Sequence, residues 1–288
     1  MCGGPGKCSE SPVNHPTPPA DEDARIRQAR TNWSRHWERV AAGPAPDLFS
    51  LKARLKRFLR RGGGVELAWR LVRRETGDPR GQRLLEAGCG TAEHSLRLAR
   101  AGNRVVLLDV SRAALEFDQR RARDLGLPAA AVQASILHLP FKPGIFDAAF
   151  NVGVLDHFGP EMRARALAEM LRVTRESGRV ISVNNDTRSG IHPLAMRRAQ
   201  RAGRWPFGPK DGVASLRDCL PPQLRRDGAV REYSRGFAGQ FEYLHYYFAP
   251  ESRARKVFLT VYYLASCALN ALNFIPGQFR VTVIRKRG

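Results

Sequence analysis

A short glycine turn flanked by acidic residues is the feature of this sequence with the clearest chemistry. Residues 84–92 read Leu-Leu-Glu-Ala-Gly-Cys-Gly-Thr-Ala and stand where an apolar run typical of a buried strand ends. Gly88 and Gly90 allow the backbone to turn tightly and to approach a ligand closely. Asp109 ends the next apolar run, 21 residues after Gly88, and an acid at this spacing suits a bidentate contact with ribose hydroxyls. The sequence therefore predicts a nucleoside site at the ends of two neighbouring strands.

The acidic residues of this turn distinguish between two classes of nucleoside cofactor. A dinucleotide places its pyrophosphate at the helix N-terminus and favours a third glycine, where this chain has Glu93. Glu86 adds another carboxylate at the strand end, and both would repel a diphosphate. S-adenosylmethionine has no phosphate, and its amino group and sulfonium are cationic. The charges therefore favour the methyl donor as cofactor.

Apolar runs alternate with helical patterns between residues 83 and 185. Such alternation predicts an α/β fold with a doubly wound, mostly parallel sheet and helices on both faces. The expected strands cover residues 83–87, 104–108, 131–134, 146–152 and 180–184, and the expected helices cover 91–100, 111–125 and 160–178.

These segments resemble the class I S-adenosylmethionine-dependent methyltransferases. The glycine turn is similar to the first motif of that family, and Asp109 stands where its second motif has the ribose-binding acid. The resemblance implies a Rossmann-like, seven-stranded sheet whose last strand is antiparallel. It extends through residues 133–141, similar to the segment that touches adenine, 146–152, similar to the fourth strand, and 171–173, before the fifth strand.

The resemblance implies a set of cofactor-binding residues at four strand ends. Ser135 stands where the family has an acid, which removes a charged contact to the adenine amino group. Its hydroxyl can still form a hydrogen bond, and the backbone amide of Ile136 can supply another contact. The implied residues are Glu86, Gly88, Cys89, Gly90, Asp109, Val110, Ser135, Ile136 and Asn151.

His157 is the candidate general base. It follows the fourth expected strand, at the sheet edge where ligands lie, and an imidazole titrates near neutral pH. The alternative is a histidine that packs on the cofactor or bonds to the backbone. Methyl transfer from a sulfonium is an in-line displacement in which positioning supplies much of the rate. The sequence has no metal-ligand cluster, so we predict no metal.

Other segments are expected to surround this core. Trp33 and Trp37 are four residues apart, so they share a helix face that we expect to close over the cofactor. His192, Tyr243, His245 and Tyr246 belong to the expected lid. The expected division is a disordered tail over 1–22, helices over 23–80, the methyltransferase core over 81–185, a substrate lid over 186–277 and the last core strand over 278–288.

The lid composition and the charge bear on the acceptor and on partners. The lid is rich in Phe, Tyr and Leu, which predicts a small apolar or amphipathic acceptor methylated on O, N or C.

The net charge of +21 admits peripheral contact with an anionic membrane or a nucleic acid, but arginine is spread through every segment without interleaved aromatics. Residues 151–154 read Asn-Val-Gly-Val, unlike the Asn/Asp-Pro-Pro-aromatic tetrad of base-amine methyltransferases. An RNA or protein methyltransferase and a non-catalytic binding module remain alternatives.

Cysteine usage and hydropathy bear on location. Five cysteines at irregular spacing form no disulfide framework, and no apolar segment resembling a signal peptide occurs in residues 1–22. We therefore predict a cytoplasmic protein, with membrane association as the alternative. Residues 257–275 are apolar enough for either a lid helix or a membrane-inserted one.

Overall fold

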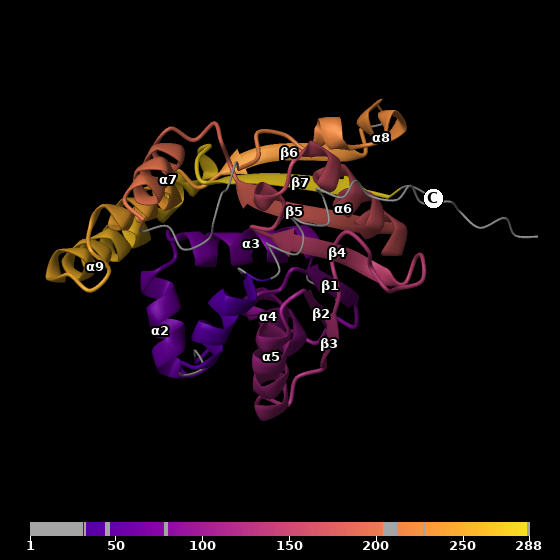
Figure 1. Cartoon of the computed structure of the whole chain (residues 1–288), viewed down its shortest axis with the longest axis horizontal. Coiled ribbons are helices and arrows are strands. Elements are labelled where there is room, and N and C mark those ends of the chain that lie inside the picture. The colour runs from indigo at the N-terminus through magenta and orange to yellow at the C-terminus, as the bar shows by residue number, and fades with distance from the viewer. Residues whose placement is uncertain are drawn as a thin grey trace, which may run out of the picture.

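A seven-stranded sheet forms the centre of the molecule, in the order β3-β2-β1-β4-β5-β7-β6 (Figure 1). The computed structural model describes residues 31, 33–43, 47–77, 80–203, 212–226 and 228–286, so the tail predicted over 1–22 lies outside the described residues. The strands are β1 (Arg83–Ala87), β2 (Arg104–Asp109), β3 (Ala129–Gln133), β4 (Phe146–Val152), β5 (Thr174–Asn185), β6 (Val230–Arg235) and β7 (Phe279–Arg285).

Strand direction confirms the predicted doubly wound sheet. The pairs β1–β2, β2–β3, β1–β4 and β4–β5 are parallel, whereas β7 runs antiparallel to both β5 and β6. The strand order reverses between β1 and β4, because the chain first builds outward to β3 and then returns. In open α/β sheets, such a reversal opens a crevice at the carboxyl ends of the strands, where ligands bind. The glycine turn follows β1 at that edge.

Helices cover both faces of the sheet and bury two apolar layers. One layer joins β1 and β4 to α3, α4 and α5 through Leu71, Leu96 and Leu115. The other joins the opposite strand faces to α6 through Leu167 and Met170. The helices are α2 (Leu51–Leu59), α3 (Gly64–Thr76), α4 (Glu93–Arg100), α5 (Arg112–Asp124), α6 (Pro160–Val173), α7 (Ile191–Arg201), α8 (Pro222–Arg226) and α9 (Arg253–Ala268), with 3-10 turns η1 (Leu155–His157), η2 (Arg217–Cys219), η3 (Ala238–Tyr247) and η4 (Leu269–Phe274).

Two boundaries differ from the sequence prediction. Helix α6 ends at Val173 rather than at Gly178, and β5 begins at once at Thr174. The polar residues before Gly178 form an irregular start to the strand, with Ser177 at a φ of 61° and a register shift opposite β4. The expected lid over 186–277 is interrupted by β6, which joins the sheet beside β7. The sheet therefore draws its edge strand from within the expected lid.

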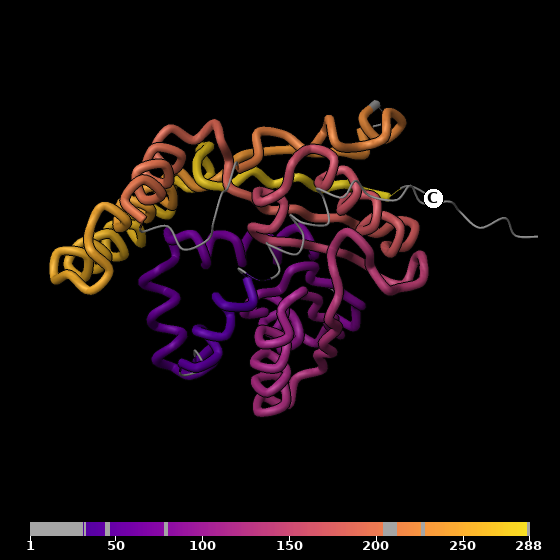
Figure 2. The backbone as a smooth tube through the Cα atoms, viewed as in Figure 1, coloured from indigo at the N-terminus to yellow at the C-terminus, as the bar shows by residue number. Residues whose placement is uncertain are grey.

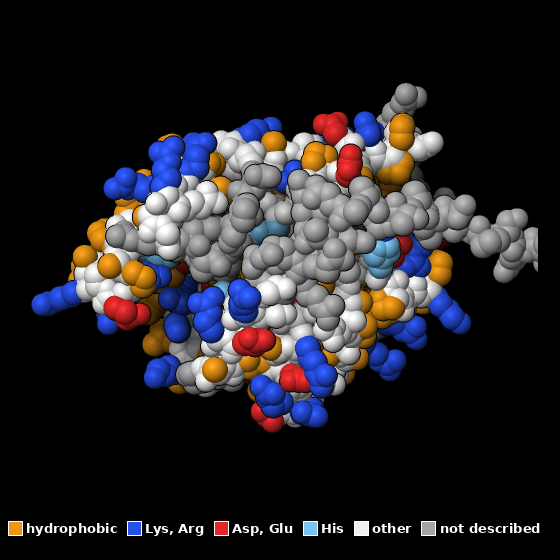
Figure 3. Space-filling view, in the orientation of Figure 1, with side chains coloured by type: hydrophobic (Ala, Val, Ile, Leu, Met, Phe, Trp, Pro, Cys, Tyr) orange, Lys and Arg blue, Asp and Glu red, His pale blue; other side chains and the backbone are white. Residues whose placement is uncertain are grey.

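The remaining lid segments gather at one end of the molecule. Helices α7 and α9 lie beyond the carboxyl end of β5, and α2 lies at the same end (Figures 1 and 2). The loops that bind ligands in this architecture therefore meet a helical cap. Lys and Arg side chains are spread over the face of the molecule shown in Figure 3, consistent with arginine use throughout the chain.

Candidate active site

The turn after β1 has the tight backbone that its glycines predict. Gly88 and Gly90 have φ values of 83° and 56°, and Ala92 has a φ of 45° at the start of α4. The amides of Gly88 and Cys89 donate to the carbonyl of Leu108 at 2.7 and 3.0 Å, which ties the turn to β2. A Cβ on Gly88 would lie 2.6 Å from a methyl carbon of Val154, so no larger residue fits without displacement.

Two predicted carboxylates flank the turn and are buried. Glu86 is 2% exposed, and its Oε2 accepts from the amide of Ser95 at 3.3 Å. Asp109 accepts from the amide of Gly90 at 3.0 Å and from that of Ser111 at 2.9 Å. Burial raises the pKa of Glu86 from 4.5 to about 8 and also raises the pKa of Asp109. Both groups thus stand in a site that would gain from a cationic ligand.

A third carboxylate, missed by the sequence analysis, completes this cluster. Asp118 is fully buried on α5, and the thiol of Cys89 donates to it at 3.8 Å. Burial raises the pKa of Asp118 to about 8, although Arg121 lies 3.4 Å away. The signal available in the sequence was its spacing. Asp118 lies three residues after Leu115, on the apolar face of the helix, where an acid needs a functional or structural reason.

The segment after β3 meets the same cluster. The amide of Ala134 donates to the backbone carbonyl of Asp109 at 3.1 Å, and the side chain of Gln133 donates to the carbonyl of Val110 at 3.1 Å. Ser135 accepts from the amide of Leu137 at 3.2 Å and so shapes the turn that carries buried Ile136. The structure thus brings the predicted residues of β1, β2 and β3 to one edge of the sheet.

Asn151 does not join them through its side chain. It is fully buried, donates to the sulfur of Met170 at 3.4 Å and accepts from the hydroxyl of Ser182 at 3.0 Å. Side chains alternate along β4, so Asn151 lies on the face covered by α6, opposite Phe150. The side chain of Asn151 therefore packs β4, β5 and α6 together, and its role as a cofactor contact stays a prediction.

An aromatic group lies over the turn, as predicted for the N-terminal helix. Residues 33–41 are helical, and Trp33 and Trp37 stack with ring centroids 6.0 Å apart. A Cβ on Gly90 would lie 2.8 Å from Cζ2 of Trp37, so this indole rests directly on the turn. The rings of His157 and Trp33 meet edge to face with their centroids 5.1 Å apart. The Nε2 atom of His157 lies 3.8 Å from a carboxylate oxygen of Asp156.

A second buried polar group lies at the carboxyl ends of β4 and β5. Asn185 donates through its side chain to Asp156 at 2.6 Å, and the hydroxyl of Tyr243 donates to Asn185 at 3.0 Å. Burial raises the pKa of Tyr243, and the ring of His192 lies 4.1 Å from it. Asn185 was not singled out from sequence, whereas Tyr243 and His192 were placed in the expected lid. The group joins the sheet edge to η3 and α7, next to the site of His157.

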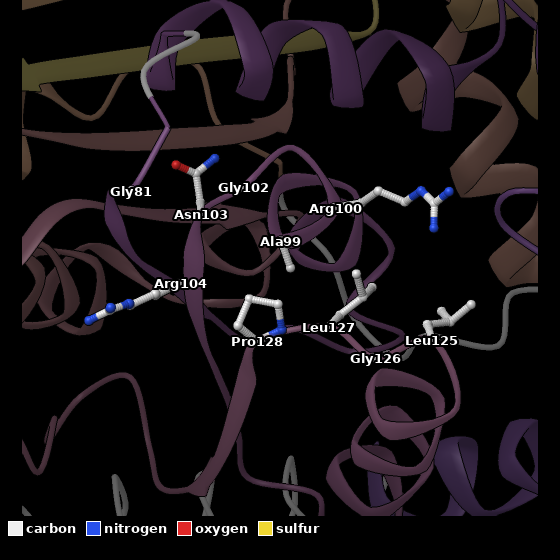
Figure 4. A pocket seen from close by; sticks show the side chains of 10 residues that line it. All are labelled: Gly81, Ala99, Arg100, Gly102, Asn103, Arg104, Leu125, Gly126, Leu127 and Pro128. Carbon is white, nitrogen blue, oxygen red and sulfur yellow. The ribbon is translucent and has the colours of Figure 1, made fainter.

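An open cavity of about 660 Å³ lies elsewhere, at the amino ends of the strands (Figure 4). It is lined by Gly81, Arg104 and Pro128, which precede or begin β1, β2 and β3. The side chain of Asn103 in its wall already accepts from Gln82 and donates to Leu98. This cavity lies at the amino ends of the strands, whereas the glycine turn lies at their carboxyl ends, so the cavity is not the site for a ligand of the turn. Within the described ranges, no group of three or more His, Cys, Asp or Glu could hold a metal ion.

Fold and site together define a class I, Rossmann-like methyltransferase architecture. Residues 85–182 match the family described as methyltransferase domain. Demethylmenaquinone methyltransferase from Renibacterium salmoninarum is 38% identical over 120 residues, covering 41% of this chain and 48% of that protein. The chain spans about half the length of the curated relatives it matches.

Solved structures share the fold over nearly the whole chain. Geranyl diphosphate C-methyltransferase from Streptomyces coelicolor A3(2), in complex with S-adenosyl-L-homocysteine, has a TM-score of 0.57 at 16% identity and covers 90% of this chain and 98% of that one. The [4+2]-cyclase SpnF has a TM-score of 0.50 at 21% identity and covers 94% and 98%. Identities this low establish the fold alone, and a fold can host different reactions.

Proposed function

We propose that this protein transfers a methyl group from S-adenosylmethionine to a small acceptor bound beneath the cap of α7, η3 and α9. The observation that carries the proposal is the cluster of Glu86, Asp109 and Asp118 around the glycine turn, with Arg121 as the buried cation beside it. A cationic nucleoside would stabilise the ionised forms of these buried carboxyl groups, whereas a diphosphate would favour keeping them protonated and would gain no attraction from them. The names of the relatives support methyl transfer as the reaction.

The residues present fit this cofactor. Asp109 stands at the end of β2 with its carboxylate held by two backbone amides, in the place where the resemblance puts the ribose contact. Glu93, whose carboxylate would repel a diphosphate, pairs with Arg97, and Arg97 also binds Glu66. Arg97 thus offsets only part of the charge of Glu93 and Glu66, and the preference for a cation rests mainly on the three buried carboxyl groups.

The chain contributes positioning and exclusion of water. When bound, the cofactor supplies a methyl group activated by its sulfonium. Trp37 covers the turn at Gly90, and Trp33, which stacks on Trp37, contacts the ring of His157. A site closed in this way holds its reactants in one geometry and keeps water out. His157 lies at the junction of turn and cap, so we retain it as the group that takes a proton from an acceptor that must lose one.

An apolar or amphipathic acceptor fits the cap. Its 3-10 segment η3 carries Phe241, Tyr243 and Tyr246, and burial raises the pKa of Tyr246 to about 12, so these phenols stay neutral. The acceptors in the names of the relatives, demethylmenaquinone and geranyl diphosphate, are small molecules. This supports a small-molecule acceptor and leaves its identity to experiment.

Transfer of labelled methyl groups tests the proposal. Purified protein would be incubated with methyl-labelled S-adenosylmethionine and small-molecule extracts separated by polarity, and label in the organic phase would be counted. Wild type should transfer label. Asp109→Ala should lower the rate of transfer at least about tenfold, because a lost charged hydrogen bond costs about 1.5–3 kcal/mol. Asp124→Ala, at an exposed position, should transfer label at the wild-type rate. Binding of the donor without transfer to any extract would instead favour the non-catalytic binding module.

A further inference from the structure

Exposed apolar side chains are concentrated on two helices of the cap end. Among the described residues, twelve large apolar side chains are exposed, and nine of them lie on α2 or on α9 and η4. We call these nine the α2–α9 face. Its members are Leu51, Leu55, Phe58, Leu59, Val257, Val261, Leu264, Leu269 and Phe274. Large exposed apolar groups of this kind mark a contact with a partner or a membrane.

The two helices adjoin, so their exposed apolar side chains lie on neighbouring parts of the surface. The thiol of Cys267 on α9 donates to the carbonyl of Phe58 on α2 at 3.6 Å. Gly62, just after α2, packs so closely on Ser266 that a Cβ there would lie 2.2 Å from its carbonyl oxygen. The apolar residues of α2 recur with helical spacing, yet the helix turns Ala53 inward and leaves Leu55 59% exposed. An amphipathic helix with its apolar side in water lacks its partner.

The charge around this face indicates what the partner is. Helix α2 carries four Lys or Arg residues, α7 carries three and α9 carries three, and none of the three helices contains Asp or Glu. Figure 3 shows orange apolar side chains at the end of the molecule formed by α9, with blue basic side chains on either side. An apolar surface bordered by cations complements an anionic lipid interface.

We propose that the α2–α9 face docks this protein on the surface of an anionic lipid bilayer. Residues 253–274 form one helical stretch that is long and apolar enough to cross a membrane, and most of it is not buried. Its inner side, however, is bonded to the protein. Tyr262 donates to the carbonyl of Ala238 at 3.3 Å, and Asn273 accepts from the amide of Ala238 at 3.1 Å. Crossing the bilayer would break these bonds, so the helix lies in the plane of the interface.

Vesicle flotation with the full chain tests this surface. Wild type should float with vesicles of phosphatidylglycerol and phosphatidylcholine and bind vesicles of phosphatidylcholine alone several-fold more weakly. Val261→Ser with Leu264→Ser should lower the partition coefficient at least about tenfold, because each large apolar group contributes about tenfold when fully buried. Both side chains are exposed, so the variant should fold like wild type, and thermal melting would check this.

A matched pair of charge variants separates this face from general attraction by a basic protein. Lys52→Glu with Lys56→Glu changes two exposed residues of α2, and Arg120→Glu with Arg123→Glu makes the same change in net charge on α5. The α2 variant should bind anionic vesicles at least about tenfold more weakly than the α5 variant, at about fivefold per basic residue. Equal loss in both variants would overturn the proposal, as would wild type that does not float. A dimer in light scattering that the Val261→Ser, Leu264→Ser variant converts to a monomer would overturn it too, because a second copy would then cover the face.

Discussion

Replacing Glu86 with glutamine tests the buried acidic cluster through the pH dependence of stability. In the folded protein, burial raises the pKa of Glu86 from 4.5 to about 8. An unfolded chain ionises this group near pH 4.5, whereas the folded chain keeps it protonated up to about pH 8. The contribution of Glu86 to stability is therefore fully present at acid pH and is lost as pH rises from about 4.5 to about 8.

The size of the effect follows from the two pKa values. Each tenfold difference in proton affinity is worth about 1.4 kcal/mol, so an isolated group would cost the wild type about 3–4 kcal/mol between pH 5 and pH 8. Asp109 and Asp118 share the same buried region, and a charge on either one repels a charge on Glu86. Relaxation of that cluster reduces the expected cost to about 2 kcal/mol, or a melting temperature difference of about 5 °C for a chain of this size.

The assay compares wild type and Glu86→Gln by thermal melting at pH 5 and pH 8. Glutamine does not ionise, so the variant should gain about 5 °C on wild type between the two pH values, whatever its fixed cost of substitution. Exposed Glu161→Gln should show no such gain. A Glu86→Gln difference that is the same at both pH values would refute the reasoning, because it would mean that Glu86 is ionised in the folded protein throughout.

Three further substitutions test the turn, the polar group beneath the cap and the base. Gly90→Ala should destabilise the fold by about 1–2 kcal/mol because of its positive φ, and by more because the added methyl group would contact the indole of Trp37. Gly126→Ala, at a φ of 61° with nothing within 4 Å, should show only the cost of the backbone strain, and urea unfolding compares the two variants. Tyr243→Phe should lower the free energy of unfolding by about 1–2 kcal/mol, because the buried side chain of Asn185 loses a donor; an unchanged urea midpoint would contradict that bond. His157→Gln should lower the rate of methyl transfer by about 10²-fold or more with donor affinity retained, and an unchanged rate would remove it as the base.

The sequence predicted the core well because continuous apolar runs determine it. The strands over 83–87 and 146–152 were placed at their observed bounds, since both are apolar segments ended by turn residues. The sequence prediction placed the residues of β6 in the lid, because the order of segments along the chain does not show that this strand pairs with β7. The start of β5 was missed because Glu176, Ser177 and Gly178 have the composition of a loop.

The site shows the same division between local and tertiary information. Glu86, Asp109 and the glycines follow from spacing, because each ends a strand or begins a turn. Asp118 reaches the turn only through the packing of α5, and Asn151 turns away only because α6 and β5 offer its amide two partners. Such choices depend on elements distant in sequence, so a strand end can be predicted more securely than the contacts of its side chain.

Isothermal titration with the methyl donor and with a dinucleotide tests the central claim most directly. Wild type should bind S-adenosylmethionine with release of a proton near pH 7, seen as a binding enthalpy that changes with the ionisation enthalpy of the buffer, because the cation favours ionised carboxylates in the cluster. It should not bind the dinucleotide at the same site, and Glu86→Gln should reduce both the affinity and the proton release. Tight binding of the dinucleotide, or donor affinity unchanged in Glu86→Gln and Asp109→Ala, would contradict the account.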